Sequence, residues 1–457
     1  MSADREVDVV VIGAGPAGEV CAGRLADHGL EVALVESDLI GGECSYYACM
    51  PSKGLLRPGE LMAEARRVPG VREAITGELD VQSALDRRDE TIHDLDDSGQ
   101  VEWLDRHRVA LIRGRGRLDG ERRVVVGGQR LTVRRAVVVA TGSGTLIPPL
   151  EGLAEARPWT NREATTAKSV PERLLILGGG MVGVEMAQAW SSLGCAVTLV
   201  EALPRLISRE EEFASEQVAD ALRERGVDVR TGAEATAASR ADGEVTLRLE
   251  GGDELTADEL LVAIGRRPHT DDLGLETVGM QPGEPIEVDD RMRSSRHEWL
   301  YAIGDVNGRS LLTHMGKYQA RLLADHLGTG ADIPVTQDGP VAPRVIFTDP
   351  QVAAVGHTLA SAREAGMNVR AVDGSTSGSA GASYVGRNTA GTSRLVVDEE
   401  RKVIVGATFV GVEVADWLHA ATIAVVGEVP IERLRHAVPA FPTRSEVWLY
   451  LLQDYWG

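Results

Sequence analysis

Residues 7–18 form the stretch VDVVVIGAGPAG, in which an apolar run interrupted only by Asp8 ends in three spaced glycines, Gly13, Gly15 and Gly18. A helical pattern follows the last glycine, and a second apolar run occupies residues 32–35. Strand, glycine-rich turn, helix and strand in this order predict a βαβ unit, in which the glycines let backbone N–H groups and the helix N-terminus approach a pyrophosphate. The sequence therefore predicts a dinucleotide-binding site at the start of the chain.

The same arrangement recurs between residues 174 and 200, with glycines at Gly178, Gly180 and Gly183. In each copy a glutamate closes the second strand, and Glu36 and Glu201 each follow the last glycine of their motif by 18 residues. A carboxylate at this point can accept hydrogen bonds from a ribose diol. One glycine motif alone is weak, since such clusters also mark ordinary turns, but two matched copies favour two bound dinucleotides.

Glu201 predicts which nucleotide the second site binds, because its negative charge would repel a 2′-phosphate. We therefore expect NADH, with NADPH the less favoured cofactor. Arg205 and Arg209 follow closely and are the counter-argument, because a guanidinium could bind that phosphate. The other interpretation of both arginines is a solvated helix start.

Composition bounds the class of protein. The chain has 457 residues, enough for two or three domains, and its formal net charge of -21 argues against nucleic-acid binding. No apolar stretch is long enough for a membrane span, and the first strand begins near residue 7, so we expect neither a membrane segment nor a signal peptide. Four cysteines are too few for a disulfide framework in a chain of this length, which predicts a cytoplasmic protein.

The rest of the chain predicts an α/β fold with two Rossmann-like dinucleotide-binding domains and a separate C-terminal α+β domain. Residues 136–140 are expected to form a buried strand, and residues 148–152 a linker. Towards the C-terminus we expect paired strands at residues 392–397 and 403–410, followed by an apolar helix at residues 414–426.

Residues 41–53, GGECSYYACMPSK, carry the strongest chemical signal. Four residues separate Cys44 from Cys49, whereas two residues separate the cysteines of most zinc pairs, and the sequence has no second cysteine pair or histidine cluster to complete a tetrahedral site. We therefore expect no metal. Cys21 and Cys195 fall inside the helix and strand patterns of the two βαβ units, and we expect them to be core residues.

With this segment the chain resembles the pyridine nucleotide-disulfide oxidoreductases, the family of dihydrolipoamide dehydrogenase, glutathione reductase and mercuric reductase. The resemblance covers nearly the whole chain, and its further segments are ATG at residues 140–142, AIGRRP at 263–268, YAIGD at 301–305, and FTDP at 347–350 with VG at 355–356. It implies an FAD-dependent NAD(P)H-disulfide oxidoreductase that binds FAD and NADH, forms a homodimer and reduces a small-molecule acceptor.

The resemblance also implies roles for individual residues. Cys44 and Cys49 would be the redox-active disulfide. Lys53 would pair with Glu185 near the flavin N5, and residue Met181 would cover the nicotinamide site. The candidate catalytic residues are Cys44, Cys49, Lys53, Glu185 and Glu446. The candidate cofactor-binding residues are Gly13, Gly15, Gly18, Glu36, Gly42, Lys53, Thr141, Gly142, Gly178, Gly180, Gly183, Glu201, Gly265, Gly304 and Asp305.

By the same resemblance, Gly304 and Asp305 return the chain to its first domain, with the Asp305 carboxylate on the ribityl chain of the flavin. The FAD-binding domain is then discontinuous. We expect its two parts at residues 1–148 and 269–335, an NAD(P)H-binding domain at 149–268, and a C-terminal dimerisation domain at 336–457.

In the reaction that the resemblance implies, hydride passes from NADH to the flavin, and an electron pair then passes to the disulfide through Cys49. Cys44 is released as the thiol that exchanges with substrate. We expect Cys49 to become a stabilised thiolate. The adjacent flavin, the neighbouring helix start and Lys53 could each stabilise that charge.

The C-terminal segment departs from the family pattern. Where the family has His-Pro-Thr-x-x-Glu, residues 441–446 are FPTRSE, and phenylalanine cannot transfer a proton. His436 lies five residues earlier and is a poor substitute. Glu446 is equally well interpreted as a helix-start carboxylate. Tyr46 and Tyr47, between the cysteines, could narrow access, supply a phenol or pack against the next helix.

The leading hypothesis is an oxidoreductase that passes electrons from NADH through FAD to Cys44 and Cys49, and on to a disulfide or other small acceptor, without the usual histidine. A dihydrolipoamide dehydrogenase with an altered proton path and a low-turnover redox-sensing flavoprotein are the alternatives.

Overall fold

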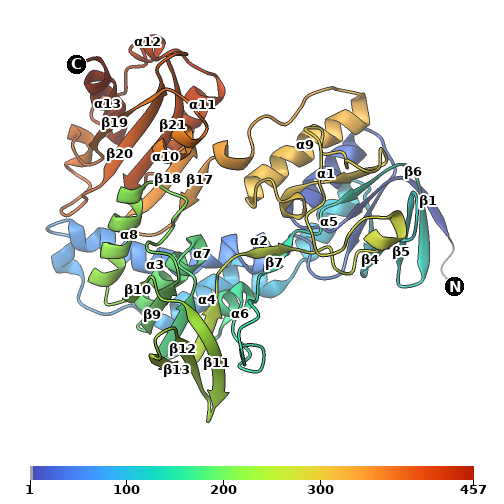
Figure 1. The fold of residues 1–457 in the computed structure, drawn as a ribbon, viewed down its shortest axis with the longest axis horizontal. Coiled ribbons are helices and arrows are strands. Elements are labelled where there is room, and N and C mark those ends of the chain that lie inside the picture. The colour runs from blue at the N-terminus through green and yellow to red at the C-terminus, as the bar shows by residue number, and fades with distance from the viewer. Residues whose placement is uncertain (1–3) are drawn as a thin grey trace. The chain divides into compact units, whose positions relative to one another are not determined.

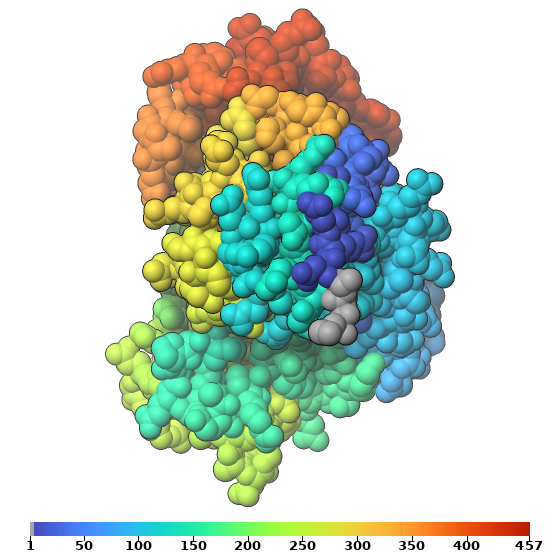
Figure 2. Space-filling view, turned by 90° about the vertical axis from the view of Figure 1, so that its right-hand side faces the viewer, coloured from blue at the N-terminus to red at the C-terminus, as the bar shows by residue number. Residues whose placement is uncertain are grey.

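The computed structural model describes residues 4–457, with Pro340 described by its backbone alone. Its helices and strands (Figure 1) fall into two compact units, each assembled from three segments of the chain. The first unit contains the N-terminal segment to Pro51, Asp89–Leu146 and Arg266–Gly339, whereas the second contains Ser52–Arg88, Ile147–Gly265 and Pro340–Gly457. Figure 2 shows the three segments of the first unit, in blue, cyan to green, and yellow to orange, packed side by side.

The first unit is built on a sheet in the order β3-β2-β1-β6-β5-β4, with β16 paired to the end of β6. Its strands are β1 (Arg5–Ile12), β2 (Val32–Glu36), β3 (Ala110–Arg113), β4 (Gly116–Leu118), β5 (Arg123–Val126), β6 (Gln129–Val139) and β16 (Leu300–Ala302). The central pairs of β1 with β2 and with β6 are parallel. Val9 and Val11 of β1 face one hydrophobic core, and Val10 and Ile12 face another. Burial on both faces explains the apolar run of this strand.

Helices α1 (Pro16–Asp27), α5 (Ser98–Arg106) and α9 (Thr313–Thr329) cover the face that carries Val9 and Val11. The short helix α2 (Gly42–Tyr46) precedes α3 (Cys49–Arg67), and α4 (Val81–Thr91) follows along the chain. Strands β7 (Ser143–Thr145) and β15 (Arg266–Pro268) pair antiparallel within the first unit.

The second unit contains a parallel sheet in the order β10-β9-β8-β14 and an antiparallel sheet of β11, β12 and β13. Their bounds are β8 (Arg173–Leu177), β9 (Ala196–Glu201), β10 (Asp228–Thr231), β11 (Ala235–Ala241), β12 (Glu244–Leu249), β13 (Glu254–Ala257) and β14 (Glu259–Val262). Leu175 of β8 packs against Leu247 of the antiparallel sheet, while Ile176 packs into the core that α7 supplies. The helices of this part are α6 (Asn161–Thr166), α7 (Met181–Ser192) and α8 (Glu212–Glu224).

The C-terminal part of the second unit is a five-stranded antiparallel sheet in the order β17-β18-β21-β20-β19. Its strands are β17 (Arg344–Ile346), β18 (Gln351–Gly356), β19 (Val369–Ser375), β20 (Thr392–Asp398) and β21 (Val403–Gly411). Its helices are α10 (Leu359–Glu364), α11 (Leu418–Val426), α12 (Ile431–Leu434) and α13 (Val447–Trp456). The expected pairing of strands at 392–397 and 403–410 is confirmed, since β20 and β21 pair antiparallel.

One predicted boundary is wrong. The apolar helix expected from Val414 begins at Leu418, and the preceding residues form turns. Glu413 has a φ of 52°, which an α-helix does not contain. Val414 is nevertheless fully buried in the core of this sheet, so its apolar character reflects packing rather than helix formation.

The fold class is confirmed: the chain is an α/β protein with two Rossmann-like nucleotide-binding parts and a C-terminal α+β part. Within residues 4–457, no helix is both long enough and apolar enough to span a bilayer.

Candidate functional site

The first glycine loop joins β1 to α1, and two of its glycines are required by the packing of the chain itself. Gly13 has a φ of 101°, and a Cβ there would lie 2.4 Å from the Ala140 carbonyl oxygen. A Cβ on Gly18 would lie 1.9 Å from the Gly13 oxygen. At Gly15 a Cβ would meet nothing within 4 Å, so the chain does not need glycine there for its own packing. Open space in front of this backbone fits the close approach of a pyrophosphate.

In the second glycine loop, between β8 and α7, two glycines are again required by packing and the middle one is not. A Cβ on Gly178, whose φ is 112°, would lie 2.5 Å from the Ala263 carbonyl oxygen, and a Cβ on Gly183 would lie 1.8 Å from the Gly178 oxygen. Gly180 again faces open space. Both loops therefore fit a dinucleotide, on the same geometric grounds.

The two glutamates at the strand ends are held in matching ways. Glu36 Oε2 accepts a hydrogen bond of 2.7 Å from the Ala14 N–H, and Glu201 Oε2 accepts one of 2.6 Å from the Gly179 N–H. Each donor is the second residue of its glycine loop. Each carboxylate therefore lies beside the loop, where it can accept hydrogen bonds from a ribose whose phosphate binds there.

The two arginines that follow Glu201 have different environments. The Arg205 guanidinium donates to the Ser208 and Glu210 carbonyl oxygens and to Ser215 Oγ, at 2.6 to 3.0 Å, which fixes it within the loop before α8. Arg209 is exposed. Arg205 therefore has a structural role that the sequence does not reveal.

Cys44 and Cys49 come together in the first unit, at the ends of α2 and α3. All four cysteines lie within the described residues and are present as thiols. A hydrogen bond with Cys49 raises the pKa of Cys44, and burial and the charge of a Cys49 thiolate raise it further. Thr313 Oγ1, at the start of α9, lies 3.4 Å from Cys49 Sγ and also bonds Cys44. The two thiols are therefore neighbours, and a disulfide could join them.

The glycines before the cysteine pair place it beside the first glycine loop. Gly41 and Gly42 have φ values of 109° and 54°, in the left-handed region that favours glycine. A Cβ on Gly42 would lie 2.9 Å from the Cα of Gly15. The start of α2 therefore lies against the backbone that faces the open space of the first loop.

Asp305 belongs to a polar network that also lies in the first unit. Its carboxylate accepts a hydrogen bond of 2.6 Å from Ser143 Oγ, and Arg266 donates to the same hydroxyl at 2.7 Å. Arg266 also lies 3.8 Å from Glu43. Burial raises the pKa of Asp305, while the Ser143 hydrogen bond and the Arg266 charge oppose this effect. A half-buried carboxylate of this kind fits a hydroxyl-bearing ligand.

The remaining glycine-motif residues flank this network. Thr141 Oγ1 donates to the His269 carbonyl oxygen at 2.9 Å. Gly142, Gly265 and Gly304 have φ values of 69°, 152° and 73°. All three positions therefore place the chain in conformations that a side chain rarely adopts.

Lys53 and Glu185 form an ion pair within the second unit. Lys53 Nζ lies 2.7 Å from Glu185 Oε2, and the Glu185 side chain is nearly fully buried. The other Glu185 oxygen accepts the Phe347 N–H at 2.9 Å, and the Lys53 ammonium lies 4.5 Å from the centre of the Phe347 ring. Lys53 follows Cys49 by one turn of α3.

The C-terminal segment gives its residues unlike environments. Phe441 is 77% exposed, and His436 is exposed as well. Glu446 is buried, forms a capping box with Thr443, and accepts the Gly381 N–H at 3.1 Å. Its carboxylate thus holds the helix start, as the second of its two interpretations expects.

The two tyrosines between the cysteines differ in environment. Tyr46 is buried, and its hydroxyl donates to the Asp96 carbonyl oxygen at 3.3 Å. Burial raises the pKa of Tyr46 to about 12. Tyr46 is therefore a packing residue, while Tyr47 is half-buried.

Cys21 and Cys195 are confirmed as core residues. Both are buried in hydrophobic clusters, and burial raises the pKa of each to about 12. Across residues 4–457, no group of three or more histidine, cysteine, aspartate or glutamate side chains could hold a metal ion.

Some residues of the site carry no motif of their own. Ser143 and Arg266 stand next to motif segments, which is the only signal they have. Thr313 follows Asp305 along the chain but lies next to the cysteines only because α9 packs against α1. A sequence without an alignment does not show such contacts.

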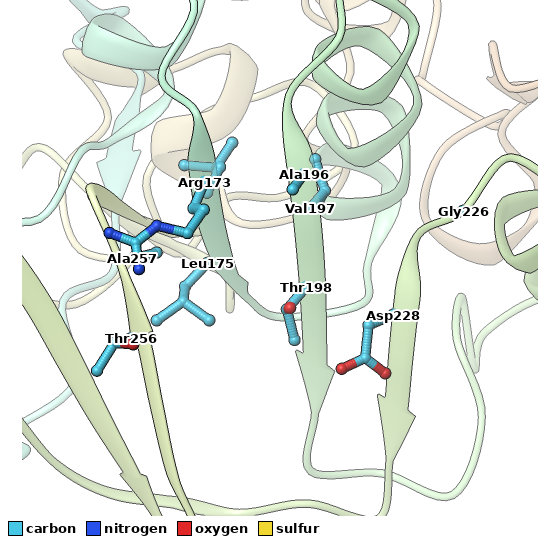
Figure 3. A pocket seen from close by; sticks show the side chains of 10 residues that line it. Arg173, Leu175, Ala196, Val197, Thr198, Gly226, Asp228, Thr256 and Ala257 are labelled. Carbon is cyan, nitrogen blue, oxygen red and sulfur yellow. The ribbon is translucent and has the colours of Figure 1, made fainter.

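One pocket of about 250 Å³ lies elsewhere in the second unit (Figure 3). It is lined by the first residues of three neighbouring strands, Arg173, Ala196 and Asp228. The glycine loop follows the opposite end of β8, so this pocket is not the dinucleotide site. Arg173 is engaged there by Glu244 and Asp258.

Comparisons with known proteins agree with this geometry. Residues 7–320 match the family model of the pyridine nucleotide-disulphide oxidoreductases, and residues 342–451 match the dimerisation domain of that family. A dihydrolipoyl dehydrogenase of Haloferax volcanii is 32% identical over 98% of this chain and 96% of its own. A mercuric reductase of Lysinibacillus sphaericus is 30% identical over 96% of this chain and 81% of its own.

Among solved structures, the Cu(II) complex of the HOCl-induced flavoprotein disulfide reductase RclA from Escherichia coli superposes with a TM-score of 0.86. It is 25% identical, and the match covers 98% of this chain and 99% of that one. Fold, glycine loops and sequence relatives thus agree on an FAD-dependent enzyme that uses NAD(P)H. The chain belongs to the pyridine nucleotide-disulphide oxidoreductase family and is an oxidoreductase of the flavoprotein disulfide reductase type.

Proposed function

We propose that this enzyme passes electrons from NADH through FAD to a Cys44–Cys49 disulfide, and from there to a small acceptor other than lipoamide. The observation that carries the proposal is the contact between the two thiols beside the first glycine loop. Bound FAD would supply the two-electron chemistry that links a nicotinamide to a disulfide.

The residues of the first unit would bind FAD. The backbone at Gly15 and the start of α2 at Gly42 leave room for the pyrophosphate, and Glu36 is placed to accept the ribose hydroxyls. Asp305, supported by Ser143, would accept a hydrogen bond from the ribityl chain. Thr141, Gly142 and Gly304 would line the same site.

The residues of the second unit would bind NADH through Gly180, Glu201 and Gly265, and would hold Lys53 ready for the flavin. The Glu185 carboxylate fixes the Lys53 ammonium, so the positive charge has one defined position. The proposed FAD-binding domain comprises residues 1–148 and 269–335, the NAD(P)H-binding domain residues 149–268, and the dimerisation domain residues 336–457.

The cysteines divide the exchange chemistry between them. Where the acceptor is a disulfide, the Cys44 thiolate would attack it, forming a mixed disulfide and releasing one thiolate of the acceptor. The Cys49 thiolate would then attack the Cys44 sulfur, restoring the Cys44–Cys49 disulfide and releasing the second thiolate. Two electrons leave the cysteine pair, and the two released thiolates take up the protons that the cysteines lost.

NADH is the proposed nucleotide because Glu201, beside the second glycine loop, would accept the ribose hydroxyls, and because Arg205 is fixed by two carbonyl oxygens of its own loop and by Ser215 of α8. Arg205 therefore loses those hydrogen bonds if it turns to a 2′-phosphate. Arg209 is exposed and is the remaining competitor for such a phosphate.

The acceptor is inferred from the C-terminal segment. Phe441 stands where the family has a histidine, and Glu446, the other ionisable residue of that motif, is engaged by Thr443 and Gly381. Lipoamide, the substrate class of the dihydrolipoyl dehydrogenases, needs a proton relay at the exchange thiol. A mercuric acceptor is disfavoured because the last cysteine of this chain is Cys195. Quinones, which are not reduced by thiol–disulfide exchange and can take their protons from water, need no relay at the exchange thiol and fit the site better.

We also propose a homodimer, supported by the match to a dimerisation domain and by exposed apolar side chains in the C-terminal part. Strands β20 and β21 are already buried within the chain, so the proposed interface is formed by exposed apolar side chains such as Ile423 and Val426. A cytoplasmic location is proposed from the cysteine content alone.

The test compares two half-reactions in the same protein. Stopped-flow mixing with NADH should reduce bound FAD quickly, and steady-state turnover with a quinone should follow. Turnover with lipoamide should be lower by roughly 10²- to 10⁴-fold, the usual contribution of a positioned acid-base group. Phe441→His should raise lipoamide turnover and leave NADH-dependent flavin reduction unchanged. Wild-type lipoamide turnover as fast as quinone turnover would overturn the acceptor proposal, and purified protein that cannot be loaded with FAD would overturn the electron path.

A further inference from the structure

Helix α9 presents two side chains on the face that lies towards the cysteine pair. Thr313 is its first residue, and its hydroxyl contacts Cys49 Sγ at 3.4 Å. Lys317 follows four residues later, and residues at this spacing lie on the same face of a helix. Helices α9 and α1 pack side by side in the first unit (Figure 1), which keeps this face next to the start of α1.

Close packing against α1 and Gly304 fixes the backbone of α9 at the turn that carries Lys317. A Cβ on Gly316 would lie 3.2 Å from the Ala17 side chain and 3.3 Å from the Gly304 backbone. Since Gly316 immediately precedes Lys317, that turn of α9 has little freedom to move. The position of the lysine relative to the cysteine pair is therefore set by the backbone.

The Lys317 ammonium is uncommitted in this arrangement. It is half-buried, yet within residues 4–457 it donates no hydrogen bond and forms no ion pair. A lysine at such a position can pack its aliphatic stem against the protein and keep its ammonium free to interact with a nearby negative charge. A thiolate that forms only in the reduced enzyme is a suitable partner.

We propose that Lys317 stabilises the thiolate form of Cys44 and so promotes exchange with the acceptor from within the same chain. The inference deepens the proposed function, on which it rests, because it concerns the exchange thiol of that reaction. Lys317 is a positioning residue in this scheme: it supplies a positive charge on the cysteine side of α9, and Thr313 supplies a hydrogen bond to the Cys44 sulfur. It does not replace the proton transfer that the position of Phe441 lacks.

The electrostatics around Cys44 agree in sign. The Lys317 charge and the Thr313 hydroxyl lower the pKa of Cys44, against the larger opposite effects of Cys49 and burial. Glu19, on the first turn of α1, is the acidic group on the same side. Burial raises the pKa of Glu19, and Lys317 lowers it, so the lysine acts on both groups. With Glu19 ionised, part of the Lys317 charge is offset, and the stabilisation of the thiolate is smaller.

The experiment measures thiol reactivity directly and needs no turnover. FAD-loaded enzyme is reduced anaerobically and alkylated with iodoacetamide over a pH series, and the Cys44 and Cys49 peptides are quantified by mass spectrometry. In Lys317→Met the apparent pKa of Cys44 should rise by about half to one unit, which slows its alkylation at neutral pH about three- to tenfold. Lys317→Arg should keep the wild-type profile.

Arg321→Met is the matched control, because Arg321 is an exposed cation one turn further along α9. It should leave the Cys44 profile unchanged, and the flavin absorbance of each variant reports whether the protein is folded and loaded. An unchanged Cys44 profile in folded Lys317→Met, or an equal shift in Arg321→Met, overturns the inference. Failure of the proposed function is distinguishable, because it would show in the wild type as no NADH-driven reduction of bound FAD.

Discussion

Glu201 and Arg205 are four residues apart and differ in what they can offer a nucleotide. The carboxylate of Glu201 faces the glycine loop, whereas the guanidinium of Arg205 is held by acceptors of its own loop. The identity and position of Glu201 could be predicted from the sequence, because strand, loop and helix recur with fixed spacing. The partners of Arg205 could not, because two of the three are backbone carbonyl oxygens, which any residue supplies.

We expect Glu201→Ala to narrow the preference for NADH. Loss of charged hydrogen bonds to the ribose costs about 1.5 to 3 kcal/mol, so kcat/KM for NADH should fall about tenfold or more while that for NADPH holds or rises. Steady-state kinetics with both nucleotides measure the change, and Arg209→Ala shows whether the exposed arginine contributes. A wild-type enzyme with the higher kcat/KM for NADPH would contradict this prediction.

At the scale of single elements, some glycines of the two loops are needed for packing of the chain, and others leave space for a ligand. In the second loop, a Cβ at Gly183 meets a carbonyl oxygen at 1.8 Å, but one at Gly180 meets nothing within 4 Å. Gly183→Ala should therefore lower the free energy of unfolding by about 1 to 3 kcal/mol. Gly180→Ala should leave it within about 0.5 kcal/mol of the wild type and raise the KM for NADH. Urea unfolding and NADH kinetics read the two effects separately, and a stability loss in Gly180→Ala would show that the open space is needed by the chain itself.

The segment that begins at Thr443 combines a family motif with a helix cap. Phe441 and Glu446 occupy positions of a family motif. The Glu446 carboxylate caps the helix start and accepts a hydrogen bond from the Gly381 N–H. The capping pattern of threonine and glutamate three residues apart is visible in the sequence. The contact with Gly381 is not, because that residue lies 65 positions away along the chain.

We expect Glu446→Ala to destabilise the protein by about 1 to 3 kcal/mol, because it removes the cap and leaves the buried Gly381 N–H without its acceptor. Glu446→Gln keeps an oxygen acceptor and should restore most of that stability. Urea denaturation of both variants, beside quinone turnover, checks the assignment. A stable Glu446→Gln enzyme whose turnover is abolished would show that the carboxylate has a chemical role instead.

At the scale of the whole molecule, the sequence predicted the fold class but not which surfaces the chain leaves uncovered. Apolar runs identified β1 and β8 as strands buried on both faces. Residues 414–426 are also mostly apolar, yet they contain a buried turn residue, Val414, and helix α11. Hydrophobicity alone does not distinguish a side chain that is buried within its own chain from one that is buried only when another protein surface covers it.

Helix α11 is the surface from which we predict the dimer. Leu418 and Ala421 are buried in the core of the C-terminal sheet, but Ile423 and Val426 are 58% and 45% exposed. A helix that is apolar on its outer face as well as its inner face is expected to be covered by another surface. Ile423→Asp should therefore shift the protein from dimer to monomer at micromolar concentration in sedimentation velocity, with the flavin still bound. Ile333→Asp is the matched control, since Ile333 is 50% exposed but lies outside the C-terminal domain, and it should leave the dimer intact. Wild-type protein that sediments as a monomer would refute the dimer, whereas a dimer that survives Ile423→Asp would move the interface away from α11.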